Sequence, residues 1–342
     1  MKKIALIIDG ISNSGGTDKV ASILSNLFSE NDYVVNLYSL KKGKPYYPIN
    51  DKVIIKYQGE DNYFKKCREI CKQLIKNKTE IVIVISMGKL SSIMIPILKA
   101  SAFTGKIICS DHVSIETFSL AKRLLKYISY WLSDEVIVLT EHDRIYLNKI
   151  FGVKVKCIPN ISSFNGFSCT EYTTRENIAV AIGRLSYQKN FNELIEIWHQ
   201  SNINDWDLFI IGSGEEKLDL EKKITSLKLK NVKILPPIKN IEYWYNKASL
   251  LLMTSRYEGL PLVLIESKDF GVPALSLNCK TGPKEIIDND GLLAENKEEF
   301  VKNLVNLTES KQLRCHFSQN AILNSRKYSK EMILKKWVKL FG

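Results

Sequence analysis

Two carboxylates stand eight positions apart where a loop is expected to turn into a helix, Glu258 before the helix and Glu266 within it. Pro261 is typical of a first helical turn, and Gly271 with Pro273 is typical of a helix end, so the helix is expected over about 261–270. At a rise of roughly 1.5 Å per residue the pair can contact both ends of one small ligand. On its own, the pair indicates a polar ligand that carries hydroxyl groups.

The start of this helix also offers backbone donors. The N–H groups of Gly259, Leu260 and Leu262 face a helix mouth, where an anion is favoured. The alternative is an ordinary turn flanked by two surface charges. That alternative is weaker for Glu266, which follows the apolar run 262–265 and needs a partner if it is buried.

Two cations occupy a comparable place at the start of the C-terminal half. Arg184 and Lys189 follow Gly183 at the end of an expected strand, 178–182. Cations that converge at a strand end can stabilise a leaving diphosphate. The alternative is a solvated basic pair, which is common in loops. With the two carboxylates, the cations indicate a sugar nucleotide.

A glycine pair follows the first expected strand, 4–8. Gly15 and Gly16 precede a helical pattern, and glycines at a helix N-terminus let the backbone approach a phosphate. A tight turn is the alternative. Neither the dinucleotide signature nor the P-loop signature is present, which argues against a nicotinamide enzyme and an ATPase.

Short β-branched runs alternate with amphipathic ones along the whole chain, which predicts parallel α/β structure. The segment 162–175 lacks periodicity and resembles a linker, after which the alternation restarts. We therefore expect two doubly wound, Rossmann-like domains, 1–160 and 161–325, with a ligand cleft between them and a C-terminal helical segment, 326–342, that returns to the first domain. The expected strands are 4–8, 34–38, 81–85, 106–109, 135–139, 153–158, 178–182, 207–211, 232–235, 250–253 and 274–277.

Three of these elements resemble motifs of glycosyltransferase family 4. The stretch 258–266 matches E-G-x-P-x-x-x-x-E, residues 183–190 match G-R-L-x-x-x-K-[N/G], and Gly15-Gly16-Thr17-Asp18-Lys19 matches G-G-x-[E/D]-[R/K]. The resemblance implies a GT-B fold with an acceptor-binding first domain and a nucleotide-sugar-binding second domain. It also implies that Glu258 contacts donor-sugar hydroxyls, that Glu266 holds the ribose, and that Gly259, Leu260 and Pro261 line the donor site.

The same resemblance extends to weaker matches. It places Ile238 at the nucleobase and His112, at the end of the expected strand 106–109, near the donor sugar. Residues 278–287 are similar to the D-C-x-T-G-P-x-E-I-I of bacterial surface-polysaccharide enzymes, with Asn278 in place of Asp. The turn around Gly212 and Gly214 is interpreted as a βα turn beside the donor pocket, with no role for its side chains.

The segment 118–132 is expected to be an amphipathic helix. Its apolar residues Ala121, Leu124, Leu125, Ile128 and Leu132 would pack on the sheet, and Lys122, Arg123 and Lys126 would gather on another side. These cations are either a solvated face or a site for the diphosphate of a polyprenol-linked acceptor or for an anionic membrane surface, with Tyr127, Tyr130 and Trp131 near the interface.

Composition limits the remaining possibilities. The formal charge is +12, and residues 1–165 carry 24 Lys and Arg against 15 Asp and Glu, which suits a polyanionic or anionic-membrane partner. The seven cysteines form no metal-binding pattern and are interpreted as reduced thiols. No apolar run reaches the length of a membrane span or of a signal peptide, so the expected location is the cytoplasm, peripherally on the inner membrane.

We therefore expect a retaining glycosyltransferase that moves a hexose or N-acetylhexosamine from a UDP-sugar to a growing polyprenyl-linked glycan of a bacterial capsule, O-antigen or exopolysaccharide. By resemblance, the leaving phosphate assists front-face transfer, Arg184 and Lys189 stabilise its charge, and no metal cofactor is needed. The alternatives are a GT-B binding subunit without turnover and a nucleotide-sugar epimerase. Nucleic-acid binding rests on net charge alone and is not expected.

Overall fold

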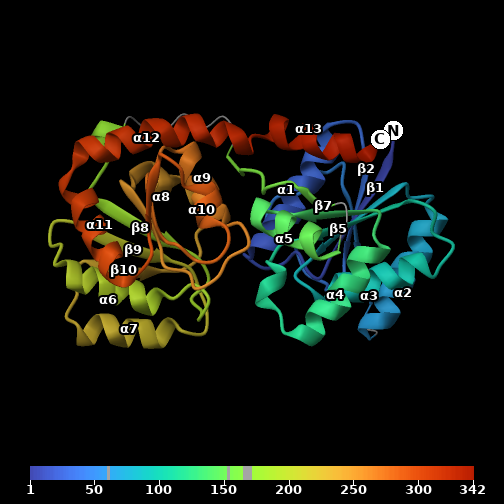
Figure 1. Ribbon diagram of the computed structural model, residues 1–342, viewed down its shortest axis with the longest axis horizontal. Coiled ribbons are helices and arrows are strands. Elements are labelled where there is room, and N and C mark those ends of the chain that lie inside the picture. Colours follow the sequence, from blue (N-terminus) through green and yellow to red (C-terminus); the bar gives the residue numbers. More distant parts are fainter. Residues whose placement is uncertain (60–61, 152–154, 165–171) are drawn as a thin grey trace. The chain divides into compact units, whose positions relative to one another are not determined.

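A computed structural model of the chain describes residues 1–59, 62–151, 155–164 and 172–342. It divides into an N-terminal unit, Met1–Ile161 with Lys330–Gly342, and a C-terminal unit, Ser162–Ser329 (Figure 1). The sequence places these divisions at 160/161 and 325/326. Each unit is built on a parallel sheet, which confirms the predicted α/β class.

The described strands of the N-terminal unit form one sheet in the order β3-β2-β1-β4-β5-β6-β7. Strands β1 and β4 lie at its centre and are almost fully buried, as strands covered on both faces must be. The strands are β1 (Lys3–Ile8), β2 (Val34–Ser39), β3 (Ile54–Tyr57), β4 (Ile81–Ser86), β5 (Lys106–Asp111), β6 (Glu135–Val138) and β7 (Val155–Cys157).

Helices cover both faces of this sheet (Figure 1). Neighbouring helices α2, α3 and α4 pack side by side on one face, and α1 packs with α13 on the other. These helices are α1 (Gly16–Glu30), α2 (Tyr63–Lys76), α3 (Lys89–Lys99), α4 (Leu120–Leu132), α5 (Glu141–Phe151) and α13 (Lys330–Phe341).

Helix α13 belongs to the N-terminal unit through an aromatic cluster. Phe28 of α1 makes edge contacts with Trp337 and Phe341, with ring centroids 5.8 and 5.3 Å apart. Tyr33 completes the cluster at 5.4 Å from Phe341. Such contacts add about 0.5–1.5 kcal/mol each to the area that the rings bury, so the end of the chain is fastened to α1.

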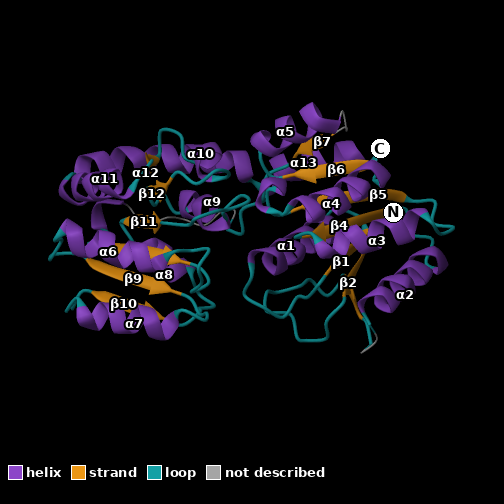
Figure 2. Cartoon of the chain, turned by 60° about the horizontal axis from the view of Figure 1, so that its bottom comes forward, coloured by secondary structure: helices purple, strands orange, loops and turns teal. Residues whose placement is uncertain are grey.

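The C-terminal unit has a second parallel sheet, whose described strands run in the order β10-β9-β8-β11-β12-β13. Helices lie on both of its faces (Figure 2). The strands are β8 (Ile178–Ile182), β9 (Asp207–Ile211), β10 (Val232–Leu235), β11 (Leu250–Met253), β12 (Ala274–Leu277) and β13 (Gly291–Ala294). The helices are α6 (Phe191–Ser201), α7 (Lys217–Ser226), α8 (Glu242–Lys247), α9 (Leu262–Asp269), α10 (Pro283–Ile286), α11 (Lys297–Glu309) and α12 (Lys311–Ser325).

Two strands are absent from the predicted set, β3 and β13, and each lies at an edge of its sheet. An edge strand has one neighbour and more exposed side chains. In β3 none of the four residues is fully buried, so no continuous apolar run marks it. The predicted strand 153–158 and linker 162–175 fall partly outside the described residues, and Cys169 lies wholly outside them.

Candidate active site

The predicted site loops of the C-terminal unit lie on either side of a topological switch point. Strands β8 and β11 are neighbours, yet the chain leaves β8 toward β9 on one side and leaves β11 toward β12 on the other. Loops that diverge in this way open a crevice at the carboxyl ends of the strands, where α/β proteins bind ligands. The loop after β8 carries Arg184 and Lys189, and the loop after β11 carries Glu258.

An ion pair joins these two loops. The Nζ of Lys189 lies 2.6 Å from Oε1 of Glu258, and the two side chains are 18% and 7% exposed. Removal of two charges from water is costly unless they are paired. The structure therefore brings one predicted phosphate-binding cation and the predicted sugar-binding carboxylate together at the switch point.

The turn after β9 supports the loop of Arg184. The N–H of Leu185 donates to the carbonyl of Ser213, at 2.9 Å. A Cβ at Gly212 would lie 1.8 Å from the carbonyl oxygen of Gly183, and one at Gly214 would lie 2.2 Å from that of Leu185. Both positions need glycine because the two backbones approach this closely. The predicted βα turn therefore supports the loop that carries Arg184 and Lys189.

A second turn supports the loop of Glu258. The hydroxyl of Thr281 donates to the carbonyl of Glu258. Gly282 has a φ of +97°, and a Cβ there would lie 2.7 Å from Cδ of Pro261. Burial, with Glu258 close by, raises the pKa of Cys279 to about 12 and keeps that thiol neutral. The segment 278–287 therefore fixes the loop, and Asn278 itself donates to exposed Glu295, at 2.7 Å.

Glu266 is buried in α9 and has the partners that its position requires. It is 3% exposed and accepts hydrogen bonds from the hydroxyls of Ser163, at 3.1 Å, and Tyr245, at 3.0 Å. Sequence reasoning missed both partners, since each comes from another part of the chain. Helix α9 begins at Leu262, one residue later than predicted, so Pro261 immediately precedes the helix.

Arg184 and Ile238 do not form part of the ion pair. Arg184 is exposed and its Nη2 contacts Oε2 of exposed Glu215, at 3.1 Å. Surface pairs of this kind contribute about 0–1 kcal/mol, so the guanidinium can turn to another anion at little cost. Ile238 is half-buried in the loop that follows β10, the edge strand.

The predicted glycine pair is exposed at the start of α1, in the N-terminal unit. Gly15 precedes the helix and Gly16 begins it. The next acidic residue, Asp18, is buried and accepts a hydrogen bond from the N–H of Asn13, at 2.9 Å, which holds the loop. Burial raises the pKa of Asp18 above its usual value. The acid of this motif thus shapes the turn, while the two glycines face outward.

His112 follows β5 and is half-buried. Its Nε2 lies 3.1 Å from the hydroxyl of Ser110, and the two residues line a small hollow with Leu24 and Trp337. Burial lowers the pKa of His112 to about 4, with Asp111 opposing and Lys126 reinforcing the shift. The imidazole is therefore neutral at pH 7, suited to hydrogen bonding rather than to charge stabilisation.

The predicted orientation of the helix that carries Lys122, Arg123 and Lys126 is wrong. Lys126 is 1% exposed and forms a buried ion pair with Asp111. Arg123 donates to the carbonyls of Glu116 and Phe118, at 2.6 and 2.9 Å. Only Lys122 of the three is fully exposed. The three cations are therefore not one basic face.

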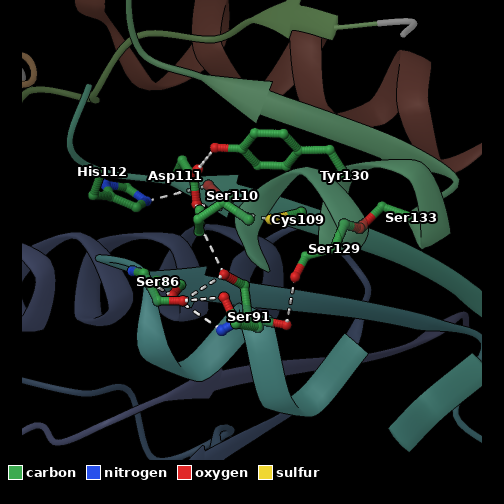
Figure 3. A network of polar contacts seen from close by, with 12 residues as sticks. Ser86, Ser91, Cys109, Ser110, Asp111, His112, Ser129, Tyr130 and Ser133 are labelled. Atoms are coloured by element: carbon green, nitrogen blue, oxygen red, sulfur yellow. Dashed lines mark hydrogen bonds and ion pairs between the residues drawn. The ribbon is translucent and has the colours of Figure 1, made fainter. Parts of the chain in front are cut away.

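A buried polar network explains the orientation (Figure 3). Asp111, at the end of β5, accepts from Lys126 and from the hydroxyl of Tyr130. Lys126 also donates to the hydroxyl of Ser91 on α3, at 2.8 Å, and the hydroxyl of Ser129 donates to the Ser91 carbonyl, at 3.2 Å. Because a buried carboxylate needs a countercharge, α4 turns its polar side inward. An Asp at the end of an apolar strand was the sequence signal for this requirement.

Two features are absent from the described ranges. There, His, Cys, Asp and Glu side chains do not gather in the groups of three or more that could hold a metal ion. Nor does a helix in these ranges combine the length and apolarity of a membrane crossing.

Two doubly wound parallel sheets, with an acid and a cation paired at the switch point of the second, are the architecture of transferases of the GT-B class. Residues 170–323 match the family model described as glycosyl transferases group 1. The Staphylococcus aureus TarM variant solved with Fondaparinux, alpha-GlcNAc-glycerol and UDP has a TM-score of 0.85 and 18% identity, with 100% of both chains covered.

Curated relatives match nearly the whole chain. The Erwinia amylovora amylovoran biosynthesis glycosyltransferase AmsD is 44% identical over 346 residues, which cover 98% of this chain and 99% of that one. A Campylobacter jejuni protein is 29% identical over 362 residues, with 100% and 99% covered, and is named GalNAc-alpha-(1->4)-GalNAc-alpha-(1->3)-diNAcBac-PP-undecaprenol alpha-1,4-N-acetyl-D-galactosaminyltransferase. The chain belongs to the group 1 glycosyltransferases, family 4, and is a glycosyltransferase of bacterial polysaccharide biosynthesis.

Proposed function

We propose that this glycosyltransferase moves a hexose or N-acetylhexosamine from a UDP-sugar to a glycan carried on a polyprenyl diphosphate, with retention at the anomeric carbon. The observation that carries the proposal is the Lys189–Glu258 ion pair at the switch point of the C-terminal unit. The ammonium group of Lys189 can bind a phosphate, and the carboxylate of Glu258 can accept hydrogen bonds from sugar hydroxyls. Because the two side chains are in contact, they suit a ligand in which a phosphate is attached to a sugar. The Campylobacter relative, named for a PP-undecaprenol substrate, supports the choice of acceptor.

Each group has a defined part in the proposed reaction. The acceptor hydroxyl attacks the anomeric carbon, the bond to the diphosphate breaks, and the proton of the hydroxyl passes to the leaving phosphate on the same face. Lys189 and Arg184 stabilise the charge that develops on that phosphate. Glu258 binds sugar hydroxyls and buried Glu266 binds the ribose. No metal takes part in the proposed reaction.

Location follows from the acceptor. A polyprenyl-linked glycan lies in a bilayer, so the enzyme acts as a peripheral protein on the cytoplasmic face of the inner membrane. Polysaccharide export pathways of the capsule, O-antigen or exopolysaccharide kind consume such a product.

The test is transfer to a polyprenyl-diphosphate glycan after a screen of nucleotide sugars for thermal stabilisation, because a ligand of the native state raises the melting temperature. Arg184→Ala is expected to lower kcat by about 10²–10³-fold with an unchanged fold, since it removes one donor to the leaving group. Lys222→Ala is the matched control, since Lys222 is an equally exposed cation that pairs with Asp219 in the same unit.

Three results would contradict the proposal. Near-normal turnover of the Arg184→Ala enzyme would show that Arg184 does not stabilise the leaving phosphate. Donor binding without hydrolysis or transfer would indicate a binding subunit. A new nucleotide sugar formed without acceptor would indicate an epimerase.

A further inference from the structure

Helix α4 exposes a continuous apolar face in the N-terminal unit. Five large side chains form this face, which we call the α4 apolar face: Leu120, Leu124, Leu125, Ile128 and Trp131, exposed by 77, 64, 55, 51 and 80%. Their spacing of three, four and seven residues places them on one side of the helix. Within α4, all of which the structure describes, no charged residue interrupts them. Exposed apolar patches of this continuity mark interaction sites.

The face is held outward by the polar network behind it. Lys126 and Tyr130 donate to Asp111, so the opposite side of α4 is tied to the end of β5. Figure 3 shows the contact of Tyr130 with Asp111. The helix cannot roll to bury its apolar side chains without breaking this buried ion pair, which is strongly unfavourable. The exposure is therefore a fixed property of the fold.

The surroundings of the face are basic. Helices α2, α3 and α4, which pack side by side, carry nine Lys and Arg residues besides the buried Lys126, and one acidic residue, Glu69. Lys65, Arg68 and Lys72 are exposed on α2, and Lys122 is exposed beside the apolar face on α4. A second protein would need an acidic groove of matching shape, whereas an anionic bilayer offers negative charge above an apolar layer without a particular shape.

We propose that α4 lies in the interfacial layer of an anionic membrane, with its apolar face in the acyl boundary, Trp131 at the headgroup level and the surrounding cations on lipid phosphates. The inference rests on the proposed function in that a membrane-borne acceptor gives this contact its use. A peripheral location can be reached through many surfaces, and the α4 apolar face is the one that makes the contact.

The experiment measures co-sedimentation of the full chain with vesicles of phosphatidylethanolamine and phosphatidylglycerol, and with neutral phosphatidylcholine vesicles. Wild type is expected to bind the anionic vesicles, less tightly as salt rises. Leu124→Gln with Ile128→Gln should weaken binding at least tenfold, roughly the loss from two inserted side chains. The matched control is Leu218→Gln with Leu323→Gln, at residues exposed by 68 and 59% in the C-terminal unit, and should change binding by less than about twofold.

Trp131 gives a second readout. Its fluorescence should shift to the blue when anionic vesicles are added, and Trp131→Phe should remove the larger part of the shift, although the chain has five tryptophans. Equal vesicle binding by wild type and the Leu124→Gln, Ile128→Gln variant would overturn the proposal. So would a wild-type dimer in velocity sedimentation that this variant converts to monomers, because the occupant would then be a second copy.

Transfer assays separate this inference from the proposed function. With a short-chain, water-soluble acceptor, the Leu124→Gln, Ile128→Gln variant should match wild type, and it should lose rate only with acceptor embedded in vesicles. Absence of any transfer by wild type, with the expected vesicle binding, would contradict the proposed function alone. Normal transfer to embedded acceptor by the variant would contradict the inference alone.

Discussion

The buried pair of Lys126 and Asp111 gives a prediction whose size follows from the structure. Lys126→Met removes the cation and leaves the Asp111 carboxylate, 4% exposed, with the hydroxyl of Tyr130 and the thiol of Cys109 as its recorded donors. Loss of one partner from a buried pair costs about 3–5 kcal/mol. For a folding unit of 150–250 residues each kcal/mol lowers the melting temperature by about 2–4 °C. The expected fall is therefore about 6–20 °C.

Calorimetry of the full chain measures this, with Lys122→Met as the control because Lys122 is exposed on the same helix. The control should stay within about 2 °C of wild type, as surface substitutions usually do. Asp111→Asn with Lys126→Met should cost less than the sum of the single changes, since it leaves neither charge alone. Strict additivity, or a Lys126→Met protein as stable as the control, would refute the interpretation of this network.

Three further predictions concern the site. Gly212→Ala should destabilise the chain and weaken donor binding, because its Cβ would lie 1.8 Å from the Gly183 carbonyl oxygen; melting temperature and donor titration measure this, and an unchanged donor affinity would contradict it. His112 has a folded pKa of about 4 against 6.5 unfolded, so its contribution to stability is full above pH 6.5 and is lost as pH falls toward 4. Between pH 6.5 and pH 4, the free energy of unfolding of the His112→Gln protein should therefore fall by about 1–3 kcal/mol less than that of wild type, as urea denaturation at each pH can test. Parallel pH profiles of the two proteins would exclude the lowered pKa of His112. Finally, transfer should survive EDTA, and a loss that Mg²⁺ or Mn²⁺ restores would require a metal in the mechanism.

The sequence predicted most strands correctly because a strand covered on both faces must be apolar throughout. Strands such as β4, buried at every position, leave little ambiguity. The edge strands β3 and β13 escaped prediction for the converse reason. Fewer buried faces require fewer apolar residues, and Lys56 can sit within β3.

The meeting of Lys189 with Glu258 was partly predictable. Motifs at the carboxyl ends of parallel strands share one edge of a sheet, and a switch point brings two of them together. The supporting contacts were not predictable. Ser163 and Tyr245 reach Glu266 from distant segments, and nothing local marks a serine or tyrosine as the partner of a buried carboxylate.

Helix α4 shows why periodicity alone misplaces a helix. The 3.6-residue pattern finds the two sides correctly, but which side faces inward depends on what the sheet presents, and here β5 presents Asp111. A helix of this sequence could bury Leu124 and Ile128 and leave Lys126 in water. The fold instead bears the cost of a buried charge pair and of exposed leucines. Buried charges and exposed apolar side chains that local sequence preferences do not explain are concentrated at functional surfaces. Helix α4 has both, and the buried ion pair is what keeps the apolar side chains exposed. The outward face of α4 is therefore expected to be a functional surface.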